Sequence, residues 1–233
     1  MKRLLIVLFC MTVVFCMCSC GGSSSTSAPE EKAEEEEPAA EEYKDVELVE
    51  YGYSVSDVGS IKIGAVVKNP DEKTAYDYPT IVVTAYDDKG DVIVEEEDTL
   101  QLILPGEQLN HGGLVTIDEE TADKIDKVEL SVKSGYAVEP PEDISKPSDF
   151  EIKEVKDETD SDTGLTVIAG LVKNNFSSDV ETVKVSALFR KDGKIVCGSY
   201  AYVDDLGVGE EKPFEFMEVN LPEYDDYELS VTR

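Results

Sequence analysis

Residues 80–94, TIVVTAYDDKGDVIV, contain two runs of β-branched and aromatic residues on either side of a turn. Val, Ile, Thr and Tyr are the residues that strands favour. The step at residues 88–90 places a glycine where a hairpin turn needs a positive φ. The stretch therefore predicts an antiparallel β-hairpin. We expect Val82, Thr84 and Tyr86, which lie at period two, to face the core.

The rest of the first half has the same texture, with turn residues every eight to twelve positions. Residues 119–126 are compatible with one short helical turn. The pattern is typical of an all-β sandwich rather than of a helical domain. The predicted strands are residues 46–49, 61–67, 80–86, 92–94, 115–117 and 128–132.

The second half of the chain repeats the first. The four repeated segments keep their order, with offsets of 105, 103, 103 and 99 residues, so the sequence predicts two copies of one domain. In the second copy we expect Val185, Ala187 and Phe189 to face the core. The pairs are 66–70 with 171–175, 84–93 with 187–196, 105–107 with 208–210, and 128–132 with 227–231.

These features predict five parts of the chain. Three prolines make the expected linker between the two sandwiches stiff and extended. Each sandwich has a normal size for independent folding, so we expect each to fold alone. The parts are a signal peptide (1–19), a lipidated Cys20 with a disordered acidic linker (20–42), a first β-sandwich (43–137), a Pro-rich linker (138–148) and a second β-sandwich (149–233).

The repeat resembles the FxLYD family of bacterial extracytoplasmic domains. The segments that carry this resemblance are VTAYD at residues 83–87 and SALFR at residues 186–190, each followed by a glycine turn. The first lacks the leading Phe and the Leu of the family pattern, and the second keeps Leu but replaces Tyr and Asp. The resemblance implies two tandem immunoglobulin-like sandwiches, and it implies no catalytic residues.

The first twenty residues have the anatomy of a secretory signal. Lys2 and Arg3 precede an apolar run at residues 4–15, which is short for a membrane span. The step Ser19-Cys20 resembles the lipobox of bacterial lipoproteins. This resemblance implies cleavage before Cys20, diacylglycerol on its thiol with acyl chains such as palmitate, and display on the extracytoplasmic side of the cell membrane, at the cell surface. An uncleaved anchor helix and an ordinary secretory signal are the alternatives.

The composition of residues 20–42 is small, polar and glutamate-rich, so no core can form there. We expect a flexible tether that its like charges extend, with a metal-binding polyacid as the alternative. Loss of residues 1–19 changes the formal charge from −31 to −33. Such a surface repels nucleic acid and favours a monomer.

The chain offers little chemistry. We expect no catalytic, cofactor-binding or metal-binding residues. Its one histidine, His111, is expected in an exposed turn. Cys197, the one cysteine of the mature chain, is expected in a buried strand position, with a reactive thiol or an intermolecular disulfide as the alternatives. Residues 157–164 alternate acids, but they lack the glycine and the terminal glutamate of an EF-hand loop.

We therefore expect a non-enzymatic, membrane-anchored lipoprotein that acts as a binding or spacer module of the cell envelope, with an unknown envelope protein as its partner. One alternative is an accessory or regulatory subunit of an envelope enzyme or transport complex. Another is a cation-binding surface protein that uses the aspartate loops. The sequence does not distinguish a one-membrane from a two-membrane envelope.

Overall fold

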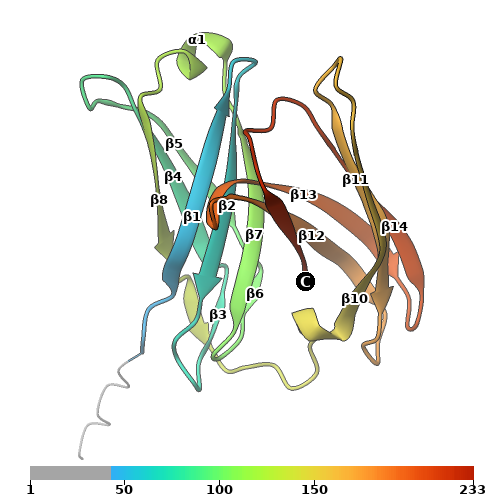
Figure 1. Cartoon of the computed structure of the whole chain (residues 1–233). Coiled ribbons are helices and arrows are strands. Elements are labelled where there is room, and N and C mark those ends of the chain that lie inside the picture. The colour runs from blue at the N-terminus through green and yellow to red at the C-terminus, as the bar shows by residue number, and fades with distance from the viewer. Residues whose placement is uncertain (1–42) are drawn as a thin grey trace, which may run out of the picture. The chain divides into compact units, whose positions relative to one another are not determined.

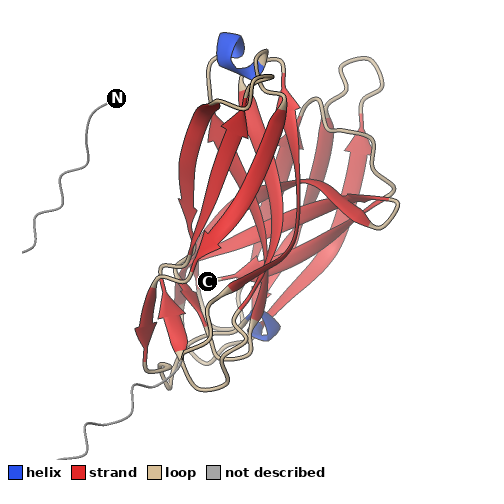
Figure 2. Ribbon diagram, turned by 90° about the vertical axis from the view of Figure 1, so that its left-hand side faces the viewer, coloured by secondary structure: helices blue, strands red, loops and turns tan. Residues whose placement is uncertain are grey.

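The computed structural model describes residues 43–233, which form an all-β body of antiparallel sheets (Figure 1). Figure 2 shows how little of this part is helical. The described residues belong to one compact unit. Within the described part, no helix is both long and apolar enough to cross a membrane. The expected signal peptide, Cys20 and the acidic linker lie outside the described residues.

The first half contains two facing three-stranded sheets, β1-β2-β7 and β5-β4-β8, and a smaller sheet, β6-β3-β9. The predicted strands are present, and several are longer than expected. The helical turn predicted within residues 119–126 is also present. The elements are β1 (Glu47–Ser56), β2 (Ser60–Lys68), β3 (Ala75–Asp77), β4 (Thr80–Tyr86), β5 (Val92–Thr99), β6 (Leu102–Ile103), β7 (Gln108–Thr116), α1 (Glu119–Ala122), β8 (Lys127–Lys133) and β9 (Tyr136–Val138).

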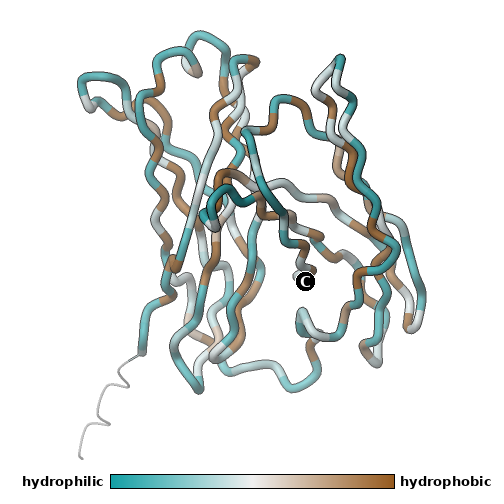
Figure 3. The backbone as a smooth tube through the Cα atoms, viewed as in Figure 1, coloured by the Kyte–Doolittle hydropathy of each residue, from teal (hydrophilic) through white to brown (hydrophobic). Residues whose placement is uncertain are grey.

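The core of the first half lies between the sheets β1-β2-β7 and β5-β4-β8. It forms because alternate residues of each strand point to the same face. Ile61 and Ile63 of β2 and Ile81 and Val83 of β4 have no exposed surface. Figure 3 shows the resulting alternation of hydrophobic and hydrophilic residues along the strands.

One predicted core face is wrong. Val82, Thr84 and Tyr86 do not belong to the core cluster, because the opposite face of β4 points inward. The inward-facing residues of β4 are Ile81, Val83 and Ala85. In the second half the prediction is confirmed, since Val185, Ala187 and Phe189 are fully buried in the core there.

The reason for the error is a difference in hairpin length. Tyr86 pairs with Val92 across residues 87–91, whereas Arg190 pairs with Ile195 across residues 191–194, one residue fewer. An alignment on the turn glycines therefore shifts the two strands by one residue. A shift of one residue exchanges the two faces of a strand.

The second half contains two more three-stranded sheets, β10-β11-β14 and β13-β12-β15. A separate core lies between them, and it includes the edge-to-face pair Phe214 and Phe216. The elements are η1 (Pro147–Asp149), β10 (Phe150–Thr159), β11 (Thr166–Asn174), β12 (Val180–Lys191), β13 (Lys194–Leu206), β14 (Glu211–Glu218) and β15 (Asp226–Thr232).

A buried asparagine holds the turn that follows β2. Asn69 has no exposed surface. Its Nδ2 donates to the carbonyl oxygens of Thr74 at 2.8 Å and Leu104 at 3.1 Å, and its Oδ1 accepts the N–H of Asp71 at 3.0 Å. The side chain thus joins three backbone groups that have no strand partner.

The second half repeats this arrangement. Asn174 is also fully buried, and its Nδ2 donates to the carbonyl oxygens of Ser178 at 2.9 Å and Leu206 at 3.0 Å. Its Oδ1 accepts the N–H of Phe176 at 2.8 Å. The Lys-Asn step that marks both repeats in the sequence is therefore one structural device used twice.

The segment between the two halves packs against the first half. Its first residue, Val138, belongs to β9, which pairs with β3. Val138 and Ile144 contact a small cluster of Ala75, Leu102 and Leu104. The domain boundaries expected from the sequence stay a prediction.

We predict that Asn174→Ala lowers the free energy of unfolding by about 2–4 kcal/mol, because it leaves buried backbone groups without partners. Asn175→Ala is the matched control, since the side chain of Asn175 is exposed, and it should change stability by less than about 0.5 kcal/mol. Urea denaturation of the two variants measures both values. Equal losses would contradict the assigned role of Asn174.

Candidate functional site

The two sandwiches meet at a seam, which we define as the contact between sheet β1-β2-β7 and sheet β13-β12-β15. Strand β13 contacts β1, β2 and β7, and β12 contacts β7. In Figure 1, β12 and β13 run across the strands of the first sandwich. Both sheets of the seam therefore have two packed faces, one toward their own core and one toward the other sandwich.

A row of glycines lets β13 approach the first sandwich. Gly64 pairs with Gly52 on one side and with Gly112 on the other, so the three form a line across the sheet. A Cβ atom at Gly52 would lie 1.9 Å from the carbonyl oxygen of Ile195, and one at Gly112 would lie 2.0 Å from that of Ser199. No side chain fits at these positions, because the backbone of β13 occupies the space.

An ion pair between Arg190 and Glu50 closes one end of the seam. Nη1 of Arg190 lies 3.1 Å and 3.0 Å from the two carboxylate oxygens of Glu50. The same carboxylate accepts the backbone N–H of Ile195 at 3.2 Å. Glu50 thus holds the side chain of β12 and the backbone of β13 at once.

Two further ion pairs join the two sandwiches beside the seam in largely buried positions. Lys62 pairs with Glu218, and its Nζ also donates to the carbonyl oxygen of Val219 at 2.9 Å. Arg233 binds Glu107 through both terminal nitrogens, at 3.1 Å and 2.6 Å. Removing one partner of such a pair would leave an unpaired buried charge.

At the centre of the candidate site is a chain of three ionisable groups, Asp98 on β5, His111 on β7 and Lys184 on β12. Nε2 of His111 lies 2.7 Å from a carboxylate oxygen of Asp98. Nζ of Lys184 lies 3.3 Å from Nδ1 of the same ring and 4.4 Å from the ring centroid of Tyr200. These three contacting side chains connect the two sandwiches.

The surroundings decide the protonation of these groups. Burial lowers the pKa of His111, although the hydrogen bond to Asp98 opposes this shift. Burial alone would raise the pKa of Asp98, but the hydrogen bond from His111 and the charge interactions with His111 and Lys184 together outweigh it, so this pKa lies below its ordinary value. A neutral imidazole therefore donates from Nε2 to an ionised Asp98. Nζ of Lys184 lies almost equally close to both ring nitrogens, 3.3 Å from Nδ1 and 3.4 Å from Nε2.

Burial also lowers the pKa of Lys184, to about 8, against the attraction of Asp98. Tyr202 follows Tyr200 on the same face of β13, and their rings meet edge to face at 5.3 Å. The aliphatic part of Lys184 and the two tyrosines form the surface of the second sandwich next to His111.

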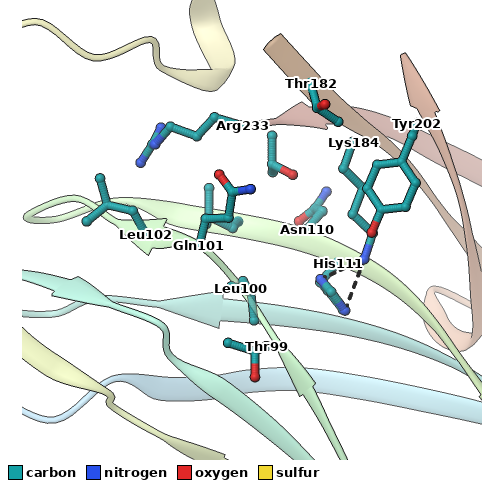
Figure 4. A pocket seen from close by; sticks show the side chains of 12 residues that line it. Thr99, Leu100, Gln101, Leu102, Asn110, His111, Thr182, Lys184, Tyr202 and Arg233 are labelled. Atoms are coloured by element: carbon teal, nitrogen blue, oxygen red, sulfur yellow. Dashed lines mark hydrogen bonds between the residues drawn. The ribbon is translucent and has the colours of Figure 1, made fainter. Parts of the chain in front are cut away.

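A cavity of about 120 Å³ adjoins this chain of groups. Figure 4 shows Lys184 and His111 pointing toward one another at one end of it and Arg233 at another. Asn110 and Thr182 supply further polar groups. Leucine side chains complete the lining, namely Leu100, Leu102 and Leu109.

The structure corrects the placement of His111. The prediction of an exposed turn is wrong, because His111 lies within β7 with 4% of its surface exposed. The predicted strand at residues 115–117 was too short, and the true strand begins at Gln108. The strand was missed because both of its faces are buried: Gly112 lies against β13, whereas Gly113 lies against Ile63 and Asp98 of the first sandwich.

The prediction for Cys197 is confirmed. It lies in β13 with no exposed surface, and burial raises the pKa of its thiol to about 12. Such a thiol stays protonated at neutral pH, which makes it a poor nucleophile.

The acidic segment 157–164 is not a single loop. Asp157 belongs to β10, and Asp160 accepts the backbone N–H groups of Asp162 and Thr163 in a tight turn. Among residues 43–233, no group of three or more His, Cys, Asp or Glu side chains is placed to hold a metal ion. Cys20, the one site residue predicted outright, lies outside the described residues.

Sequence reasoning missed Asp98, Lys184 and Arg233 as members of a site. In sequence, Lys184 between Val183 and Val185 has the pattern of an ordinary outward-facing polar residue. The glycine row was the available signal, because a glycine inside a strand often marks a close approach of another backbone.

Comparisons with known proteins add no function. No protein-family profile matches the chain, and no curated protein sequence matches it. A structure of red sea bream transglutaminase is 8% identical over 77% of this chain, with a TM-score of 0.26. This chain spans only 30% of that transglutaminase. The tandem CBM22 modules of Xyn10C from Paenibacillus barcinonensis are 10% identical, with coverage of 80% of this chain and 84% of theirs and a TM-score of 0.14. Neither likeness is close enough to support an argument.

We predict that Gly112→Ala lowers the free energy of unfolding by about 1–3 kcal/mol, because the new methyl group collides with the backbone at Ser199. Leu114→Ala is the control on the same strand, since Leu114 is 47% exposed, and should cost less than about 0.5 kcal/mol. Urea denaturation measures both. A Gly112→Ala protein as stable as wild type would show that β13 does not lie on the glycine row.

A second prediction concerns pH. In the unfolded chain Lys184 has its ordinary pKa of 10.5, whereas in the folded chain its pKa is about 8. Between pH 8 and 10.5 the unfolded state binds more protons than the folded state, so Lys184 makes the free energy of unfolding rise with pH. Below about pH 8 the full destabilisation caused by burying the charged Lys184 is present. The stability of Lys184→Met relative to wild type should therefore fall between pH 8 and 10.

Urea denaturation at several pH values tests this. Lys89→Met is the control for the loss of a lysine at an exposed position. A Lys184→Met difference from wild type that changes with pH no more than the Lys89→Met difference would mean that burial does not perturb Lys184.

Proposed function

We propose that this chain is a lipid-anchored extracytoplasmic protein, and that its body is a non-enzymatic binding or spacer module of the cell envelope. The observation that carries the proposal is the apolar leader that ends at Ser19-Cys20. The thiol of Cys20 would hold the lipid, and the membrane would be its first partner. We also propose that both sandwiches belong to the FxLYD family.

The charge of the chain supports this setting. With 52 acidic and 21 basic residues, the chain is repelled by nucleic acid and by anionic lipid headgroups. The glutamate-rich segment 20–42 would hold the body away from the membrane surface. Display at a distance from the bilayer is what a spacer or capture module needs.

The seam adds a mechanical argument. Two sandwiches on a free linker would move independently, whereas these two share a packed face and three crossing ion pairs. A body of this kind holds any bound partner at a fixed distance and orientation from the tether.

The second candidate function is an accessory or regulatory subunit of an envelope enzyme or transport complex. Leu114 and Tyr202, which are 47% and 59% exposed, line one hollow beside the seam and belong to edge strands β7 and β13. Exposed apolar side chains on strand edges are suited to docking. The cation-binding alternative has no comparable support in residues 43–233.

The test of the anchor is Cys20→Ala. It should abolish labelling by a radioactive fatty acid and leave the protein either unprocessed or released from the membrane fraction. Cys18→Ala is the matched control, because bulky Met17 precedes Cys18 where a small residue is needed, and it should be labelled and anchored like wild type. A Cys20→Ala protein that is still labelled and membrane-bound would refute the proposal.

A further inference from the structure

We propose that the cavity at the seam binds a small carboxylate with a short alkyl chain, whose carboxylate meets Lys184 and whose apolar end lies against the leucines. This inference goes beyond the display role. It concerns residues of the described body only and does not depend on the lipid anchor.

The first argument is that the lining of this cavity carries an unneutralised positive charge. Acidic residues outnumber basic ones 52 to 21 in the chain, yet the lining includes Lys184 and Arg233 and no Asp or Glu side chain. Four other hollows in the described part each include at least one Asp or Glu. Glu107 neutralises Arg233, so Lys184 is the cation that would attract an anion into the cavity.

The second argument is unsatisfied hydrogen-bonding capacity. Among residues 43–233, no carboxylate oxygen lies within 4.0 Å of Nζ of Lys184. The neighbours of the ammonium are the two ring nitrogens of His111, at 3.3 Å and 3.4 Å, and the ring of Tyr200, so it has hydrogen-bonding capacity left for a ligand. A carboxylate offers two oxygens with several acceptor positions for such donors.

Arg233 supplies an independent observation of the same kind. Its side chain is 7% exposed and its terminal nitrogens are held by Glu107. Its Nε has no hydrogen-bond partner within the described part of the chain, although it is buried. A buried N–H without an acceptor is rare and calls for an ordered water or a ligand atom.

The third argument is size and polarity. A volume of about 120 Å³ suits a small organic ligand rather than a large one. One part of the lining is polar, with Lys184, Asn110 and Thr182, and another part is formed by leucines. A short carboxylate matches both parts, whereas an inorganic oxyanion would leave the leucines without an apolar partner.

The chain contains a built-in reporter for this site. His111 is its only histidine, and it lines the cavity while in contact with Lys184. The imidazole signals in a nuclear magnetic resonance spectrum therefore come from one residue at the proposed site.

The experiment titrates the full chain with propionate at neutral pH and constant ionic strength, and follows the His111 ring signals. We expect a saturable shift. Propionamide, which has a similar shape and no charge, should produce no saturable shift. Lys184→Gln should weaken propionate binding by about tenfold or more, whereas Lys89→Gln, at an exposed lysine, should bind like wild type.

Several results would overturn the inference. They are a shift that grows linearly without saturation, a shift that chloride reproduces at equal ionic strength, an equal response to propionamide, and undiminished binding by Lys184→Gln. If Lys184→Gln does not fold, the comparison of propionate with propionamide and chloride on the wild-type chain decides the matter alone. Loss of the lipid anchor in Cys20→Ala would leave all these results unchanged, so the two proposals fail separately.

Discussion

The contact between the backbone of β13 and the row Gly52, Gly64 and Gly112 is the constraint on which the rest of this structure depends. Hypothetical Cβ atoms on this row would come within 2.7 Å of carbonyl oxygens in β13. Because the backbones of the two sheets are in direct contact, each sheet also buries the face that points away from its own core. Every charged residue near the contact must then find a partner or a cavity.

The flanking ion pairs follow from that closeness. Glu50, Lys62 and Glu107 of the first sandwich each meet a group of opposite charge from the second. Lys184 differs from these residues, because its neighbour across the seam is a neutral imidazole rather than a carboxylate. Of the charged groups that cross the seam, it is therefore the one with the most capacity left for a ligand.

The sequence predicted the all-β fold, the hairpins and the buried position of Cys197 from local patterns. It also located the Lys-Asn steps, whose asparagines prove to be buried turn supports. It assigned the wrong face to β4, since one residue of difference in a hairpin is invisible to an alignment on glycines. It placed His111 in an exposed turn, because a strand with two buried faces loses the simple alternation of polar and apolar residues.

The candidate site could not be predicted from local sequence patterns, because the contact between the two sandwiches creates it. Asp98, His111 and Lys184 lie on three strands and two sandwiches, and only the packing of the two sandwiches brings them together. Glycines at outward-facing strand positions were the one sequence signal of that packing. A sequence of this class is therefore better interpreted with its strand glycines treated as candidate contact points.

The central claim is that the two sandwiches act as one cooperative unit. Calorimetric unfolding of the full chain tests it most directly, because the calorimetric and van't Hoff enthalpies agree only when a protein unfolds as a single unit. This account predicts one transition with equal enthalpies. Two separate transitions, each with the enthalpy of one sandwich, would contradict it.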